Sequence, residues 1–198
     1  MAALGLRMLP ESEATLMRHA GLLQHWNRRL NLTAITDPAG VVVQHLLDSL
    51  AIAPWVRGGR VLDIGSGGGF PGIPLAVAMP QVQFTLLDSR GKRVEFLRHA
   101  AATLGFGNVA VVKARVEDYR PDEKFDTLVC RAFASLEEIL TLTAHLQEPG
   151  TRLLAMKGRS APDEVRALPA RGHRDITVDP VVVPFLDAER HVVRVRFD

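Results

Sequence analysis

The sequence predicts an α/β fold, a doubly wound and mostly parallel sheet of about seven strands. Short apolar runs alternate with longer helical runs from Gly58 onward, and such alternation gives parallel strands with helices on both faces of the sheet. A glycine-rich loop, GSGGGFPG at 65–72, follows directly after the first apolar run. The last two apolar runs lie close together around the turn-like LDAER, which favours a final antiparallel pair.

A helical extension is expected before the sheet. Apolar side chains recur at helical spacing over 11–30 with arginines between them, which indicates an amphipathic helix. Asp37 and Pro38 supply an N-cap and a first-turn proline for a second helix, which carries the apolar run VVVQHLLDSLAIA. We therefore expect a helical extension over 1–57, packed on the core, and a main domain over 58–198.

The elements of the main domain follow from the length and composition of each run. Short runs that are apolar or rich in β-branched residues predict strands, and longer runs with apolar residues three or four apart predict helices. Strands are expected at 60–65, 83–88, 109–114, 125–132, 151–158, 176–185 and 191–197, and helices at 71–79, 91–105 and 135–146.

Composition restricts the class of protein. The chain has 198 residues, 47% hydrophobic and 23% charged, which suits a globular domain with a real core. It contains neither an apolar run of about 18 residues nor a charged-then-apolar leader, so we expect a cytoplasmic protein without a membrane span. Cys130 is the single cysteine and is interpreted as a buried, inert thiol. The histidines do not occur at metal-ligand spacing, so no metal is predicted.

The glycine loop is the strongest candidate for a ligand site. In a doubly wound sheet the ligand lies beyond the carboxyl ends of the strands, where this loop is placed. Gly67, Gly69 and Gly72 fit the dinucleotide pattern G-x-G-x-x-G, while Gly65, Gly67 and Gly69 fit the tighter G-x-G-x-G. Neither match is specific by itself.

Three acidic residues at strand ends distinguish between the possible ligands. Asp63 lies two residues before Gly65, where a carboxylate would repel the pyrophosphate of a dinucleotide but would suit an ammonium or a ring of backbone donors. S-adenosyl-L-methionine carries an ammonium and no phosphate. Asp88 ends the next strand near the spacing of a ribose-binding acid, and Glu117 follows the third strand, where it can meet an adenine edge. The alternative is that all three are solvated loop acids.

Several stretches of the chain match one known pattern together, namely DIGSGGGFPGIPLA, LLDSRGKRVEFLRHAA, Val116-Glu117, CRAFASL with AMKG, WNRRLNLTAI and HLLDSL. With these stretches the sequence resembles the bacterial small-subunit rRNA guanine-N7 methyltransferases, a family once called glucose-inhibited division protein B. The resemblance implies a Rossmann-like class I fold and methyl transfer from S-adenosyl-L-methionine to N7 of a guanosine in 16S rRNA. It also implies that the partner is that RNA or the 30S subunit, and a monomer is expected.

The same resemblance implies which residues contact the cofactor, namely Gly65, Phe70, Val116, Glu117 and Arg131. Loop pattern and spacing add the four cofactor candidates Asp63, Gly67, Gly69 and Asp88.

Four residues are candidates for catalytic or substrate-orienting roles. Arg131 and Lys157 stand at the carboxyl ends of central strands, where cations face the pocket. Asn31 and His45, in the helical extension, can orient the substrate, although a cap or surface role is the alternative for each.

Basic residues suggest a polyanionic partner. The net charge is +2 and the cations are mostly arginine, whose planar fork suits phosphate, but an arginine-rich codon usage explains the charge equally well. Arg18, Arg28 and Arg29 are expected at the rim of the pocket, together with Arg131 and Lys157. A second cluster, Arg90, Lys92, Arg93 and Arg98, fits a solvated helix face as well as a phosphate grip.

Three other function classes remain open. A methyltransferase acting on another RNA, a protein or a small molecule would share the cofactor half. A nicotinamide oxidoreductase is disfavoured by Asp63, and an RNA-binding module with an inactive pocket would bind without turnover. The chain lacks a convincing cysteine nucleophile and an Asn/Asp-Pro-Pro-aromatic loop, and guanine N7 requires neither, because its lone pair carries no proton at neutral pH.

Overall fold

A computed structural model of the chain describes residues 4–6, 8–169 and 174–198, with the backbone alone at 174. Its centre is a seven-stranded sheet of strand order β3-β2-β1-β4-β5-β7-β6. The first five strands run parallel, and β7 is antiparallel to both of its neighbours. The predicted mixed sheet with a final antiparallel pair is confirmed. The strands are β1 Arg60–Ile64, β2 Gln83–Asp88, β3 Val109–Lys113, β4 Thr127–Arg131, β5 Arg152–Lys157, β6 Arg174–Pro180 and β7 His191–Phe197.

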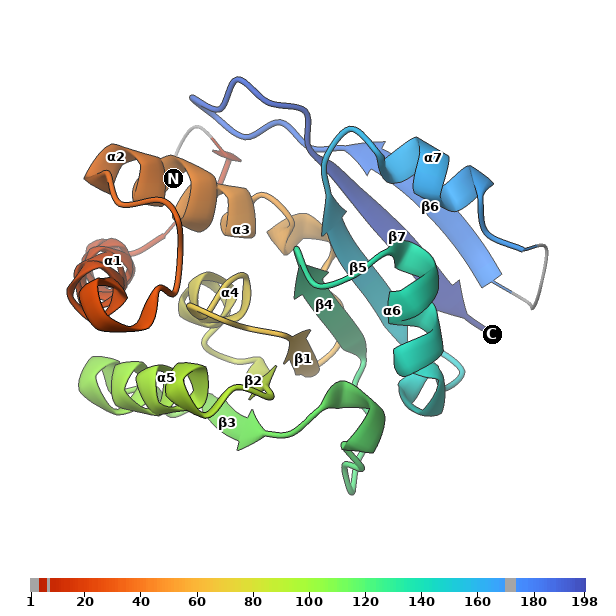
Figure 1. The fold of residues 1–198 in the computed structure, drawn as a ribbon, viewed down its shortest axis with the longest axis horizontal. Helices are drawn as coiled ribbons and strands as arrows, with labels where there is room; N and C mark the ends of the chain where they lie inside the picture. The colour runs from red at the N-terminus through yellow and green to blue at the C-terminus, as the bar shows by residue number, and fades with distance from the viewer. Residues whose placement is uncertain (1–3, 7, 170–173) are drawn as a thin grey trace.

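Helices cover both faces of this sheet (Figure 1). The face on the left of the figure carries α1 Pro10–Leu30, α2 Pro38–Val41, α3 Asp48–Leu50, α4 Gly72–Ala78 and α5 Gly91–Leu104, and the opposite face carries α6 Leu136–Leu142 and α7 Ala161–Arg166. Short 3-10 turns lie at Ala53–Trp55, Val116–Asp118 and Ala144–Leu146. Alternate side chains of the buried strands point to opposite faces, so Leu62 and Leu128 pack under α6 while Val61 and Val129 pack under α4.

The second helix of the extension begins where Asp37 and Pro38 predict, and it ends at Leu50, before the predicted end at Pro54. The carboxylate of Asp37 accepts hydrogen bonds from Ala39 N and Gly40 N, which fixes the start of α2. This helix continues without a break into a π-helical turn, Val42–Leu47, and then into α3. The wider π turn changes which side chains face the sheet, and such turns often occur at functional sites.

Two segments differ from the sequence prediction. The strand expected at 176–185 ends at Pro180, and the last cross-strand hydrogen bond runs from Val181 N to Arg190 O at 2.8 Å. A loop follows in which Val182 and Phe185 are exposed, and Pro184 in this loop lacks the N–H that further pairing would require. The helix α7 was not predicted. In the described residues no helix is long and apolar enough to cross a membrane.

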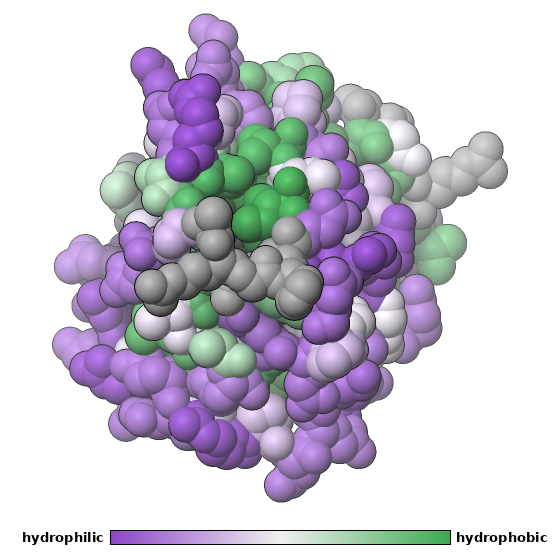
Figure 2. Space-filling view, turned by 90° about the vertical axis from the view of Figure 1, so that its right-hand side faces the viewer, coloured by the Kyte–Doolittle hydropathy of each residue, from purple (hydrophilic) through white to green (hydrophobic). Residues whose placement is uncertain are grey.

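The face that lies on the right of Figure 1 is mostly hydrophilic, with a small apolar area near its centre (Figure 2). The opposite face is covered by the extension, whose α1 packs on α4 and α5. Leu16 and Leu23 of α1 are fully buried in this contact, and Arg18 Nη2 donates to Thr103 O of α5 at 2.9 Å.

Replacing Leu23 tests whether the extension folds together with the sheet. A Cβ on Gly68 would come within 2.8 Å of Leu23 Cδ1, so this side chain packs directly beneath the glycine loop. We expect Leu23→Ala to lower the free energy of unfolding by about 2–5 kcal/mol, within a single transition seen both by circular dichroism and by tryptophan fluorescence during urea unfolding.

The matched control is Met17→Ala, a change on the same helix at a side chain that is 55% exposed. It should alter the free energy of unfolding by no more than about 0.5 kcal/mol. An early, separate transition of the extension in the Leu23 variant would contradict the expectation.

Candidate functional site

The glycine loop turns sharply at the carboxyl end of β1. Gly65, Gly67 and Gly69 have positive φ angles of 72°, 57° and 87°, a region that other residues rarely adopt. Gly65 N and Ser66 N both donate to Leu87 O of β2, at 2.8 and 3.0 Å. The loop is therefore attached to the neighbouring strand, and its backbone forms one side of an open cleft.

The cleft consists of two adjoining cavities of about 460 and 430 Å³. They share Gly65, Arg93 and Ala132, so they meet at the glycine loop and at the end of β4. The first cavity extends toward the helical extension and the second toward the end of β3. Together the two cavities form an elongated cleft, which suits an elongated ligand that lies across the carboxyl ends of the strands.

The second cavity contains the acid at the end of β2. Asp88 Oδ2 accepts from Gly67 N at 3.0 Å, Asp88 Oδ1 accepts from Arg90 N at 2.8 Å, and Arg93 lies 3.5 Å away as an ion pair. Each carboxylate oxygen has two acceptor positions. Oδ2 faces both Gly67 N and Arg93 Nη1, whereas Oδ1 accepts from Arg90 N alone and keeps one position for a ligand. Val116 and Glu117 complete this cavity.

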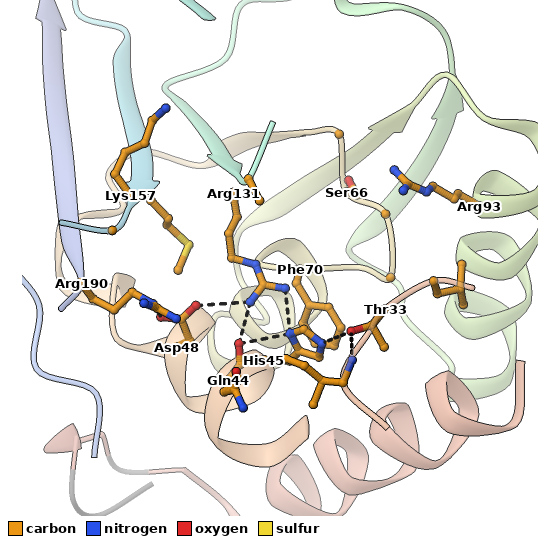
Figure 3. Close-up of a pocket in the computed structure, with 18 residues that line it drawn as sticks. Thr33, Gln44, His45, Asp48, Ser66, Phe70, Arg93, Arg131, Lys157 and Arg190 are labelled. Carbon is orange, nitrogen blue, oxygen red and sulfur yellow. Dashed lines mark hydrogen bonds and ion pairs between the residues drawn. The ribbon is translucent and has the colours of Figure 1, made fainter. Parts of the chain in front are cut away.

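Arg131 is the centre of the first cavity (Figure 3). Its Nη1 donates to Gln44 O at 2.8 Å and pairs with Asp48 Oδ2 at 3.3 Å, and its Nη2 lies 3.0 Å from His45 Nδ1. The guanidinium carbon also lies 5.1 Å from the ring centre of Phe70, within the range of a cation–π contact. Arg131 thus joins β4 to the π turn of the extension and to the glycine loop.

A second arginine shares the carboxylate of Asp48. Arg190 Nε donates to Asp48 Oδ1 at 3.1 Å, so one buried acid faces two guanidinium groups and the cluster keeps a net positive charge. Burial lowers the pKa of Arg131, and Asp48 opposes that change. The remaining positive charge makes the cavity suited to an anionic or electron-rich ligand group.

His45 is neutral in this environment. Burial, followed by the charge of Arg131, lowers the pKa of His45 to about 4. The ring stacks on Phe70 with centroids 4.6 Å apart, and Nε2 lies 2.7 Å from Thr33 Oγ1. Phe70 is thereby enclosed by His45, Arg131 and His19, whose ring centroid lies 4.9 Å from that of Phe70.

Asp63 lies beneath the loop and lines neither cavity. Its Oδ2 accepts from Gly72 N at 2.9 Å, and its Oδ1 has no hydrogen-bond partner among the described residues. Burial raises the pKa of Asp63 to about 7. The backbone donor of Gly72 therefore provides the partner that a buried carboxyl group requires.

Two further groups support the loop from below. Gly69 lines neither cavity, and a Cβ on it would meet Ile73 Cδ1 at 2.5 Å. His19 Nε2 lies 3.0 Å from Gly68 O, and burial lowers the pKa of His19 to about 4, so the neutral ring donates to that carbonyl. Sequence reasoning missed His19, although its position on the apolar face of α1 with Leu16 and Leu23 was a usable signal.

The other two catalytic candidates are placed differently. Lys157 lines the first cavity, but its Nζ donates to Ala134 O at 2.6 Å and pairs with Glu164 at 2.7 Å, and in Figure 3 it points away from Arg131 and Phe70. Asn31 ends α1 with φ 49° and its N–H bonded to Asn27 O, and it lines a separate surface cavity. The structure does not bring Asn31 into the cleft.

The expected residues that line the cleft are Gly65, Gly67, Phe70, Asp88, Val116, Glu117, Arg131, His45 and Lys157. Sequence reasoning missed Thr33, Gln44, Asp48 and Arg190, which complete the first cavity. Of the arginines expected at the rim, Arg18 is instead bonded to α5. Cys130 is buried as expected, and burial raises the pKa of its thiol to about 12. Among the described residues no group of acidic, histidine or cysteine side chains has the geometry of a metal site.

The family model, the relatives and the solved structure that this chain resembles are all methyltransferases. A family model described as rRNA small subunit methyltransferase G matches residues 12–193. The chain is similar to proteins named ribosomal RNA small subunit methyltransferase G from Aromatoleum aromaticum, at 48% identity over 98% of this chain and 93% of that protein, and from Chromobacterium violaceum, at 47% over 98% and 93%. Its fold is similar to the apo crystal structure of the S-adenosylmethionine-dependent methyltransferase SibL, with a TM-score of 0.61 and 21% identity over 87% of this chain and 61% of that chain.

The buried carboxyl group of Asp63 should give stability a characteristic pH dependence. Its pKa is about 7 in the folded protein, against 3.8 for the free group, so the stability that comes from its protonation is fully present below the lower value and is lost as the pH rises toward 7. The amide of Asp63→Asn does not titrate. We expect the stability advantage of the original protein over this variant to fall by on the order of 4 kcal/mol between about pH 4 and pH 8.

Chemical unfolding at a series of pH values measures this difference. The control is Asp122→Asn, at an exposed position, which should change the free energy of unfolding by no more than about 0.5 kcal/mol at each pH. An Asp63 difference that is constant or grows with pH would show that this carboxyl group is ionised throughout.

Proposed function

The chain belongs to the rRNA small subunit methyltransferase G family, and on that premise we propose that it methylates N7 of a guanosine in 16S rRNA. It is an S-adenosylmethionine-dependent methyltransferase acting on small-subunit rRNA, as family membership indicates. One observation supports N7 as the atom that receives the methyl group. Among the described residues around Arg131, no side chain is free to act as a general base. We also propose that the enzyme acts in the cytoplasm as a monomer.

The residues of the cleft fit the cofactor. S-adenosylmethionine supplies a methyl group on a positively charged sulfur, and it needs a long cleft with an acceptor for its ribose hydroxyls. The glycine turn leaves the cleft open, and Asp88 Oδ1 keeps one acceptor position free beside it. We propose that Asp88, Val116 and Glu117 hold the adenosine part and that Gly65 and Gly67 line the path to the first cavity. Asp63 and Gly69 would act from beneath the loop, by fixing its shape.

The chemistry of the first cavity favours an acceptor that has no proton to lose. Asp48 is committed to two guanidinium groups, and His45 Nδ1 faces the donor Arg131. Cys130 lines neither cavity, and its raised pKa keeps it a thiol. A carbon or exocyclic amine acceptor would need one of these groups as nucleophile or base, whereas guanine N7 offers its lone pair directly.

The chain's task is then to position the base and to exclude water. Phe70, fixed by His45 and Arg131, provides a rigid apolar wall. Arg131 has five N–H donors, of which three are used by Gln44, Asp48 and His45, so two remain for an anionic or carbonyl group of the ligand. Holding reactants in line in this way lowers the barrier without proton transfer.

Asp88 provides a test of the cofactor assignment. In Asp88→Asn an amide NH2 replaces one carboxylate oxygen, and this nitrogen cannot accept a hydrogen bond from a ribose hydroxyl. We therefore expect the affinity for S-adenosylhomocysteine to fall by about 1–2 kcal/mol. Calorimetry measures this loss. Asp187→Asn, an exposed loop change, is the control, and NADH should not bind to either protein. Unchanged affinity in the Asp88 variant would remove the ribose role of this residue.

Methyl transfer tests the function itself. Labelled S-adenosylmethionine should methylate small-subunit RNA isolated from a strain that lacks this activity, and the modified site should cleave after borohydride and aniline treatment, as 7-methylguanosine does. The single-turnover rate should be nearly flat from about pH 6.5 to 9, because no acid–base pair takes part. Cys130→Ser should retain activity. A tenfold rise in rate per pH unit, or a product resistant to cleavage, would exclude N7.

A further inference from the structure

Thr33 lies on the wall of the first cavity that the helical extension supplies. Its hydroxyl oxygen is 2.7 Å from His45 Nε2 and accepts from Ile35 N at 3.0 Å. The backbone of Thr33 is fixed by the side chain of Asn27, which donates to Thr33 O and accepts from Thr33 N, each at 2.9 Å. The position of this hydroxyl is therefore held from three sides.

The neighbours of His45 decide the direction of its hydrogen bond to Thr33. Arg131 Nη2 has only protons to offer, and it lies 3.0 Å from His45 Nδ1, so Nδ1 must be the unprotonated nitrogen. The carbonyl of Gln44, also near Nδ1, already accepts from Arg131 Nη1 at 2.8 Å. The single proton of the neutral ring is consequently on Nε2, and it is donated to Thr33 Oγ1.

The Thr33 hydroxyl therefore has a hydrogen-bond donor to offer, at a residue that lines the first cavity and also the surface cavity that holds Asn31. Both lone pairs of its hydroxyl oxygen are taken, one by His45 Nε2–H and one by Ile35 N–H. The hydroxyl proton has no acceptor among the described residues. A hydroxyl in this state needs an acceptor from water or from a ligand, and it cannot itself accept another hydrogen bond.

The two walls of the first cavity are expected to contact different ligands, one the cofactor and the other the target base. Gly65, Arg93 and Ala132 form the wall that continues into the second cavity, where the proposed cofactor lies. Thr33, Gln44 and His45 form the opposite wall, which the second cavity does not reach. The base that receives the methyl group must enter between these walls, so Thr33 faces the base.

We propose that the Thr33 hydroxyl donates a hydrogen bond to O6 of the target guanine and thereby selects guanine over adenine. The inference rests on the proposed function. Guanine has two acceptors on the relevant edge, N7 and O6. N7 must keep its lone pair free for the methyl group, so O6 is the partner for a fixed donor. Adenine has an amino group in the place of O6, which would set a donor against a donor.

The residue acts as a specificity determinant and does not enter the chemical step. Methylation at N7 withdraws electrons from O6, so this hydrogen bond does not strengthen during the transfer and serves recognition of the base. Removing the hydroxyl should reduce kcat/KM for the guanine substrate, and it should not change the pH profile.

The test pairs one change in the enzyme with one change in the RNA. Thr33→Val removes the hydroxyl at nearly constant size, and RNA with 2-aminopurine at the target removes O6 while keeping N7. With the natural RNA, single-turnover kcat/KM should fall roughly tenfold in the variant, as expected for one neutral hydrogen bond. With the 2-aminopurine RNA, the original protein and Thr33→Val should have the same kcat/KM. Both values should be about tenfold lower than that of the original protein with the natural RNA.

Control variants separate recognition from structure. Thr33→Ser keeps the hydroxyl and should keep the preference for guanine, and Thr36→Val, an exposed position lining the neighbouring surface cavity, should behave like the original protein. The affinity for S-adenosylhomocysteine should be unchanged in Thr33→Val. An equal loss on both RNAs would overturn the proposal, since it would show a structural effect, and so would a loss of cofactor affinity.

Failure of this inference is distinguishable from failure of the proposed function. The position of the methyl group made by the original protein on natural RNA tests the function, through cleavage of the product. The coupling between Thr33 and O6 tests the inference alone, because an enzyme that forms 7-methylguanosine without that coupling keeps its function and loses only this proposed contact.

Discussion

The cleft depends on one buried charge, the guanidinium of Arg131. A charge removed from water must be paired and hydrogen-bonded, and here the partners come from segments far apart in the sequence, namely Asp48 and Gln44 in the extension and Phe70 in the glycine loop. The contact with the Arg131 guanidinium also fixes the position of each partner. The requirement for charge compensation therefore couples the extension to the sheet more specifically than apolar packing does.

Burial disfavours charge on three ionisable groups packed around the glycine loop. It raises the pKa of Asp63 to about 7 and lowers the pKa values of His19 and His45 to about 4, while Arg131 with Asp48 and Arg93 with Asp88 form ion pairs at the cleft. Neutral side chains against the loop reduce the cost of removing water from its support, and the glycines of the loop contribute no side-chain packing of their own. The two histidines are therefore neutral supports, and Asp63 ionises as the pH rises through neutrality.

Sequence reasoning predicted the features that depend on local pattern. The alternation of elements, the cap at Asp37, the glycine turn and the placement of Asp88 at a strand end all follow from neighbours along the chain, and all are found. The π turn around Gln44 and the shared carboxylate of Asp48 depend on contacts between distant segments, which no local pattern encodes. Asn31 shows the converse, since a polar residue that looked suited to substrate has a position that its own helix end determines.

The strand order has a consequence for how the chain is made. Strand β6 reaches the sheet only through β7, which is inserted between β5 and β6. During synthesis β6 therefore emerges before the strand that holds it, while the outer edge of β5 stays unpaired. A growing chain in this state exposes an edge on which another chain can pair. Arg190 lies just before β7 and pairs with Asp48 in the folded protein. This ion pair can form only after β7 has paired with β5, so the cleft is complete only when the sheet is complete.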